Sequence, residues 1–131
     1  MRLRKADKLF RQYILKRDNY TCQRCRRRYR QDEDLQGLHV SHYWSRVREN
    51  TRFDPDNCVL LCYGCHRIWG HGDGWPEYTD FMKRKLGERG FYLLAARAQE
   101  CKKKDDALMT IYIKQLLKQN NFVKSNSEVL K

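Results

Sequence analysis

The sequence predicts a small α+β protein, in which a metal-stabilised core with short strands is flanked by helices. Three features carry this prediction: two C-x-x-C pairs, a short alternating segment between the pairs, and apolar stripes at helical spacing on both sides of them. A chain of 131 residues has room for one domain with a small core, which a structural metal ion commonly supplements. We therefore expect a single domain over residues 1–131, with its core at about residues 20–70 and a helical extension at about residues 76–119.

The first predicted element is a helix over residues 3–17. Its apolar side chains recur on one face at helical spacing and are expected to pack against the core; they are Ala6, Leu9, Phe10, Tyr13 and Ile14. The opposite face is basic, and a solvated surface and a phosphate-facing surface are both open interpretations of it. Asp18 and Asn19 are predicted to end this helix just before the first Cys pair.

The two Cys pairs predict a zinc site. Its ligands would be Cys22, Cys25, Cys62 and Cys65. Four thiolates complete a tetrahedral shell and leave no open coordination position, so this zinc ion is expected to be structural. The C-x-x-C spacing favours metal binding in a reducing compartment over disulfides. The sequence shows neither a signal peptide nor an apolar run of membrane length, so we expect a cytoplasmic protein without membrane contact.

The segment between the Cys pairs is predicted to contain two extended stretches and a loop. The first stretch is a short strand over Leu38–Trp44. Alternation assigns its side chains to two faces, one with Leu38, Val40 and His42 and the other with His39, Ser41 and Tyr43. Residues 45–56 are predicted to form a long loop, and Asn57–Leu61 a strand or a single helical turn. A short helix is expected to begin near Cys65.

The remainder of the chain is predicted to be helical. One helix is expected to begin near Pro76 and to end at Gly87 or Gly90, and a second apolar stripe covers residues 91–101. A third helix follows the basic run at residues 102–104. The stripe of this third helix is expected to be buried and consists of Leu108, Ile111, Tyr112 and Leu116.

The net charge of +12 is distributed unevenly along the chain. Residues 1–30 carry twelve Lys or Arg and two Asp, which gives +10, whereas residues 31–70 carry −2 and residues 71–131 carry +4. A basic lobe beside a mildly acidic centre suits a protein that binds a polyanion and holds a cation in its middle. The candidate polyanion contacts beside the first Cys pair are Arg26, Arg27 and Arg28.

A second pattern overlaps the Cys pairs, with His42, Asn57 and His66 in this order. These residues lie in the phrases Ser41-His42-Tyr43-Trp44-Ser45-Arg46, Asp54-Pro55-Asp56-Asn57 and Leu61-Cys62-Tyr63-Gly64-Cys65-His66. In this combination, residues 20–70 resemble the HNH nucleases, the ββα-metal family, and look most like small phage-encoded HNH proteins. The resemblance implies a zinc-stabilised ββα-metal core and a metal-dependent DNA endonuclease that hydrolyses phosphodiester bonds, nicking or cutting duplex DNA.

The resemblance also implies roles for individual residues. His42 would be the general base, because a neutral imidazole can accept the proton of a water molecule near pH 7. Asn57 would orient that imidazole or lie near the metal, and His66 would bind a catalytic Mg²⁺ or Mn²⁺ ion. Arg46 or Arg52 is a candidate clamp for the scissile phosphate, because a guanidinium matches two phosphate oxygens. Contact with the DNA backbone elsewhere is the alternative role for both arginines.

The residue before His42 departs from the family pattern. Members of the family commonly carry Asp or His there as a metal ligand, whereas this chain has Ser41, and a neutral hydroxyl is a poor ligand. Asp54, Asp56 or an additional water molecule is expected to fill the gap, with Asp56 as our candidate ligand. His39 is a weaker candidate, because strand alternation points it away from His42.

Two alternatives to a general DNA endonuclease stay open. One is a non-catalytic, zinc-braced DNA-binding module in which Ser41 marks a lost metal site, and the other is a structure-selective resolvase of branched DNA. The intact His42, Asn57 and His66 favour an enzyme. The resemblance implies DNA and other phage DNA-processing proteins as partners, in the cytoplasm of a bacterial host, and leaves the target site and the oligomeric state open.

Overall fold

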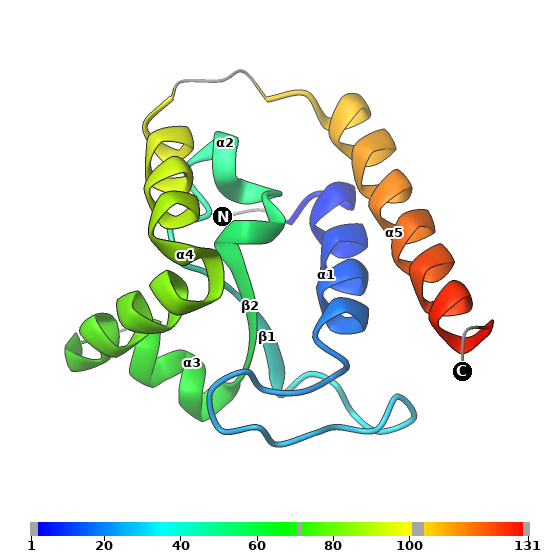
Figure 1. Cartoon of the computed structure of the whole chain (residues 1–131), viewed down its shortest axis with the longest axis horizontal. Helices are drawn as coiled ribbons and strands as arrows, with labels where there is room; N and C mark the ends of the chain where they lie inside the picture. The colour runs from blue at the N-terminus through cyan, green and yellow to red at the C-terminus, as the bar shows by residue number, and fades with distance from the viewer. Residues whose placement is uncertain (1–2, 71, 101–103, 130–131) are drawn as a thin grey trace.

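The computed structural model describes residues 3–70, 72–100 and 104–129. Its helices and strands are α1 (Lys5–Arg17), β1 (Leu38–His42), α2 (Glu49–Arg52), β2 (Cys58–Cys62), α3 (Tyr63–Gly70), α4 (Trp75–Gln99) and α5 (Asp106–Val129). Short 3-10 turns lie at Pro55–Asn57 and Gly72–Gly74. The predicted α+β class is confirmed: helices flank a small antiparallel hairpin, with α1 and α5 on one side and α3 and α4 on the other (Figure 1).

The hairpin divides the hydrophobic core into two clusters. β1 and β2 pair in register from Leu38 opposite Cys62 to His42 opposite Cys58. Because side chains alternate along a strand, Leu38 and Leu60 pack towards α1, whereas Val59 and Leu61 pack towards α3 and α4. The strand predicted from Leu38 is confirmed and ends at His42. The stretch predicted as a strand or a helical turn is the strand β2.

Helix α1 forms as predicted and covers one face of the hairpin. Ala6, Phe10 and Ile14 are buried against it. The helix begins with a reciprocal cap in which the backbone N–H of Arg4 donates to the Asp7 carboxylate at 2.7 Å. On the basic face, Arg11 donates to two backbone carbonyls of the 35–38 segment at 2.7 Å each. Arg11 therefore stabilises the fold. The two interpretations of the basic face, a solvated and a phosphate-facing surface, did not include this role.

Helix α5 packs on α1 through a face that differs from the predicted one. Ile113 is fully buried, whereas Leu108, Ile111 and Tyr112 are exposed by 53%, 57% and 39%. The prediction of a buried stripe through these three residues is therefore wrong. Apolar residues occur on more than one face of this helix, and only the contact with α1 decides which of them is covered.

Helices α3 and α4 build the second cluster around aromatic rings. Trp69 stacks on Tyr78 with ring centroids 4.6 Å apart, and Met82 and Leu94 are fully buried beside them. The predicted end of the first C-terminal helix is found at Gly87, whose φ of 74° and ψ of 163° interrupt α4. This combination is accessible essentially to glycine alone. Residues 101–103 lie outside the described residues, and with them the end of the second predicted stripe and most of the basic run at residues 102–104.

The segment between the strands is more ordered than the predicted long loop, because it contains α2 and a 3-10 turn. The C-terminal end of α4 holds it in place. Arg48 donates to the carbonyl of Ala98 at 3.1 Å, and the Asn50 amide donates to the carbonyl of Arg97 at 2.9 Å. Within the described ranges, no helix is both long and apolar enough to cross a bilayer.

Candidate functional site

The four predicted zinc ligands lie together at one end of the hairpin. Their Sγ atoms are all within 4.8 Å of one another, and those of Cys25 and Cys62 are 3.9 Å apart. Four thiolates about 2.3 Å from one zinc ion, in tetrahedral directions, have sulfur atoms about 3.8 Å apart. The cluster is therefore compatible with a tetrahedral zinc ion.

Local backbone geometry brings each Cys pair into position. In the first turn, the N–H of Cys25 points at the Sγ atom of Cys22 at 3.5 Å, and Arg26 adopts a left-handed φ of 68° that closes the turn. The second pair spans the end of β2 and the first turn of α3. Arg24 reaches across to the Sγ atom of Cys65 at 3.5 Å and is held there by Glu77. A cationic donor at this sulfur stabilises its thiolate form.

The ionisation of these thiols also suits a cation site. Burial opposes ionisation of Cys22, but backbone N–H groups, first that of Cys25, outweigh it and lower its pKa to about 7. Burial raises the pKa of Cys65 to about 12, and the neighbouring thiols add to the rise while Arg24 opposes it. In such a cluster, a thiolate on one cysteine makes ionisation of its neighbours less favourable. A bound divalent cation removes this repulsion, so that all the thiols can be deprotonated together.

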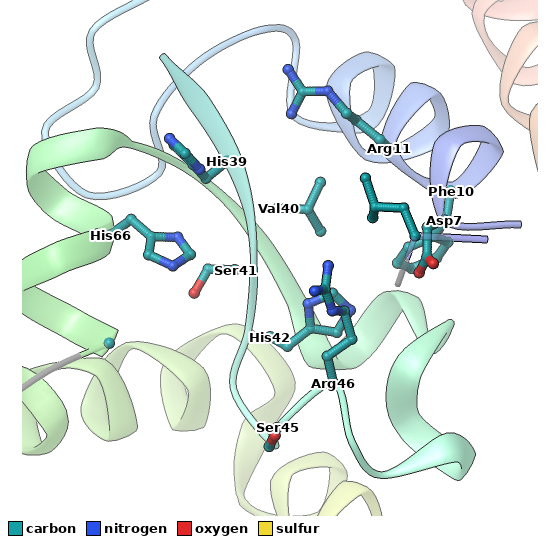
Figure 2. Close-up of a pocket in the computed structure, with 12 residues that line it drawn as sticks. Asp7, Phe10, Arg11, His39, Val40, Ser41, His42, Ser45, Arg46 and His66 are labelled. Atoms are coloured by element: carbon teal, nitrogen blue, oxygen red, sulfur yellow. The ribbon is translucent and has the colours of Figure 1, made fainter. Parts of the chain in front are cut away.

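A pocket of about 540 Å³ lies around β1, and it is lined by three of the four histidines (Figure 2). His39 and His42 come from β1, and His66 comes from α3, directly after the zinc-ligand candidate Cys65. Arg46 reaches over His42 from the segment that follows the strand. The cysteine cluster fixes the start of α3 relative to the hairpin and so determines where His66 enters the pocket.

His42 is held as a neutral imidazole by its surroundings. Its Nε2 atom lies 2.9 Å from the backbone carbonyl oxygen of Arg52. A carbonyl oxygen only accepts hydrogen bonds, so Nε2 carries the proton and Nδ1 is left with its lone pair. Burial lowers the pKa of His42 below its ordinary value, and the nearby Arg46 lowers it further, while the bond to Arg52 opposes the change. The imidazole is therefore neutral at pH 7, as a general base requires.

Residues 22–72 match the HNH endonuclease family model. The match contains all four clustered cysteines, both strands and α3, and it ends before α4. No curated protein and no solved structure gives a significant match to the chain. The resemblance to the HNH nucleases is thus confirmed for this stretch, which we call the HNH segment, and it indicates a nuclease or DNA-binding function.

The asparagine of the HNH segment is buried behind the pocket and does not line it. The amide of Asn57 donates to the backbone carbonyls of Trp44 and Thr51 at 2.9 Å each, and its Oδ1 atom accepts from the N–H of Trp44 at 2.8 Å. Thr51 immediately precedes Arg52, whose carbonyl binds His42. These bonds hold the end of α2, one residue from the carbonyl that binds His42.

Arg52, one of the two candidates for the phosphate clamp, is buried and paired within the protein. Its side chain is only 6% exposed and forms a two-bond ion pair with the Asp7 carboxylate, at 3.0 and 2.6 Å. Burial raises the pKa of Asp7, but hydrogen bonds from Arg52 and from the backbone of Arg4 outweigh it, so the pKa is lowered overall. The pair anchors α2 to α1 and so fixes the carbonyl that binds His42. This leaves Arg46, which lines the pocket, as the candidate for the clamp.

The predicted metal ligand Asp56 lies in a different pocket from His66. Asp56 and Asp54 line a cavity beside α5, where both carboxylates pair with Arg97 at 3.2 and 2.8 Å. Asp54 also accepts from the backbone N–H of Asp56 at 3.0 Å, which turns the segment towards α4. Neither aspartate lines the pocket of His66, so the structure does not support the prediction that one of them completes a metal site there.

Ser41 and His39 occupy the face of β1 that is turned towards α3 and α4. The hydroxyl of Ser41 is buried and lies 2.9 Å from the hydroxyl of Tyr78. The ring of His39 lies beside that of His66, with centroids 5.2 Å apart and planes tilted by 55°. Sequence reasoning ranked His39 low because it faces away from His42, although strand alternation already placed it on the face of Ser41.

The three arginines of the first Cys turn are exposed, as a DNA-contacting surface requires. Arg27 lies over the ring of Tyr29, with its guanidinium carbon 4.4 Å from the ring centroid, and Arg26 donates to the side chain of Gln23 at 3.3 Å. Arg28 is exposed beside them. Their charges are thus spread over the outer surface of the turn and are accessible to a polyanion.

Proposed function

We propose that the protein is a metal-dependent endonuclease that hydrolyses phosphodiester bonds in duplex DNA. The observation that carries this proposal is His42, held neutral and with its Nδ1 lone pair available, in a pocket that it shares with Arg46 and His66. The position of these residues within the HNH segment supports the proposal. A structural zinc ion on the four cysteines and a catalytic Mg²⁺ or Mn²⁺ ion complete it.

Hydrolysis requires a nucleophile and relief of the negative charge that develops on the phosphate. In our proposal, Nδ1 of His42 accepts the proton of the attacking water molecule, while Nε2 remains bonded to the carbonyl of Arg52. Arg46 binds non-bridging oxygens of the scissile phosphate, for which its planar guanidinium is suited. His66 would hold the divalent ion, which when bound polarises the phosphate and stabilises the leaving oxygen.

The buried residues around the pocket would keep this arrangement rigid. Asn57 fixes the segment between the strands, and the ion pair of Asp7 with Arg52 fixes α2 against α1. Both hold the backbone at Thr51 and Arg52, and the carbonyl of Arg52 keeps the His42 ring in one orientation and one tautomer. Such support for a reacting group is commonly needed for efficient proton transfer.

The decisive test is plasmid cleavage with one divalent ion at a time, after weakly bound metal has been removed by chelation. Conversion of supercoiled plasmid to relaxed or linear product with Mg²⁺ or Mn²⁺ is the expected result. If no ion supports cleavage but the protein still shifts DNA in a gel, the non-catalytic binding module is the better description. The buried hydroxyl of Ser41, in place of an ionised ligand, is the observation that favours this second function.

DNA binding is expected to depend steeply on salt and to use the first Cys turn. Replacing Arg26, Arg27 and Arg28 together with Gln should reduce the slope of log affinity against log salt by about one for each arginine that contacts a phosphate, because fewer counterions are released. Fluorescence anisotropy with a labelled duplex at several salt concentrations measures this slope.

A matched control removes the same charge from α5 and the residues just before it. Lys104, Lys114 and Lys118 are exposed on or beside α5, and replacing all three with Gln should leave the slope nearly unchanged. A slope that responds to the lysines and not to the arginines would place the DNA on the α5 side of the molecule.

A further inference from the structure

The residue before the proposed base is not equipped to bind a metal ion. Ser41 offers a neutral hydroxyl that is 2.9 Å from the Tyr78 hydroxyl, in a site where Ser41 is only 2% exposed. Asp54 and Asp56 are paired with Arg97 in another cavity. A cation beside His66 therefore needs a ligand from elsewhere in the pocket.

His39 is in the place where such a ligand is needed. It lies two residues before Ser41 on β1, on the same face of the strand, and it lines the pocket together with His66. Figure 2 shows the rings of His39 and His66 on one side of β1, with His42 and Arg46 on the other. The two rings come from a strand and from a helix that the cysteine cluster holds together, so their separation is fixed by the fold.

The separation of the two rings fits a shared metal ion. Two imidazoles bound to one ion in tetrahedral directions, with metal–nitrogen distances of about 2.0–2.1 Å, have ring centroids about 5 Å apart. The observed distance is 5.2 Å and the planes are inclined by 55°. The centroid separation is thus that of two imidazoles bound to one ion.

We propose that His39 and His66 form a two-histidine site for a first-row transition-metal ion, with water and phosphate oxygens as its remaining ligands. Imidazole nitrogen suits ions such as Co²⁺, Ni²⁺ and Zn²⁺, whereas Mg²⁺ prefers carboxylate and water oxygens. The site is separate from the four-cysteine cluster. Its catalytic use rests on the proposed nuclease function, but its metal binding does not. The site therefore favours transition-metal ions over Mg²⁺ as the activating ion.

The test uses Co²⁺ as a probe on the full-length, zinc-loaded protein without a histidine tag. Isothermal titration calorimetry should show one Co²⁺ site per chain, with an affinity at least ten-fold higher than that for Mg²⁺. The absorption of bound Co²⁺ should show weak visible bands without the strong near-ultraviolet band of cobalt–thiolate bonds, and the zinc content should not change.

Two variants at position 39 separate a ligand from a packing residue. His39→Phe keeps an aromatic ring against His66 and Tyr63 and removes the nitrogen donors. His39→Ala removes both. We expect each variant to lower Co²⁺ affinity by more than about ten-fold, since the loss of even an outer partner of a metal ligand costs about that much. His39→Phe should retain the thermal stability of the wild type.

Three outcomes would overturn the proposal: no Co²⁺ site besides the cysteine cluster, wild-type Co²⁺ affinity in His39→Phe, or binding of Mg²⁺ as tight as that of Co²⁺. The nuclease function is judged separately by plasmid cleavage. If the wild type binds Co²⁺ through His39 but cleaves no DNA with any ion, the metal site stands and the nuclease function fails. If His39→Phe cleaves like the wild type, the nuclease function stands and the catalytic use of His39 fails.

Discussion

Replacing His42 with Ala is expected to slow plasmid cleavage by about a hundred- to ten-thousand-fold, the usual cost of losing a general base. The effect should be this large because no other group in the described part of the pocket duplicates the neutral imidazole held by the carbonyl of Arg52. Zinc content, circular dichroism and DNA affinity should remain close to those of the wild type. Single-turnover cleavage of a labelled duplex measures the loss.

The variant His66→Ala provides the contrast. Its defect should recover in part when the concentration of the ion that activates the wild type is raised, because a missing ligand lowers metal affinity and mass action compensates. His42→Ala should show no such recovery, because its missing function is proton transfer. Normal cleavage by both variants would remove His42 and His66 from the mechanism. Loss of zinc from His66→Ala would instead assign that residue to the cysteine cluster.

The protonation of His42 is also expected to determine how the cleavage rate falls at acid pH. Burial lowers the pKa of His42 below 6.5, and the base is active only when it is neutral. The rate of the wild type should therefore fall as the pH drops through this lowered pKa and should be level around pH 7. A rate that instead falls steadily from pH 8 to pH 6.5 would show that another group, with a higher pKa, is titrating.

Replacing Cys25 with Ser is expected to release the zinc ion and to unfold the hairpin and α3. Structural zinc sites contribute their binding free energy to folding, on the order of 10 kcal/mol in zinc-finger peptides, and Cys25 supplies one of four ligands. Its own side chain is exposed, so little packing is lost directly. Elemental analysis for zinc and thermal unfolding followed by circular dichroism measure the effect.

Cys58 supplies the matched control. It is fully buried in the core, outside the four-cysteine cluster. Cys58→Ala should lower the melting temperature through lost packing and still retain one zinc ion per chain. If Cys25→Ser keeps both its zinc ion and its fold, the four-cysteine site is not what holds the hairpin together.

Features specified by neighbouring residues could be predicted from the sequence. The C-x-x-C spacing identified the cysteine cluster, helical periodicity identified α1, and alternation gave the faces of β1. Gly87 was correctly placed as one of two possible helix ends, because a glycine weakens a helix wherever it stands. Each of these features depends on a few residues that are close together in the chain.

The errors concern partners that are far apart in the chain. Arg52 was expected at the DNA, but it is paired with Asp7 across 45 positions. Asp56 was expected at the metal, but it is paired with Arg97 across 41 positions. Nothing in the local sequence separates a buried, paired charge from an exposed one, since both have the same side chain. His39 was ranked low because it faces away from His42, and the local sequence does not show that it lies beside His66 of α3.

The interruption of α4 at Gly87 has a consequence for how the specificity of this molecule can evolve. The half of α4 after Gly87 runs to Gln99 and carries Arg97, which pairs with Asp54 and Asp56 in the segment between the strands. The same segment carries Arg46 to the pocket. The direction of this half-helix is set by one residue without a side chain. If the proposed function holds, small changes in the angle at Gly87 would move Arg46 relative to His42 and change how a DNA substrate fits, while every residue that lines the pocket stays the same. Selection for a new substrate can thus act on a position remote from the chemistry.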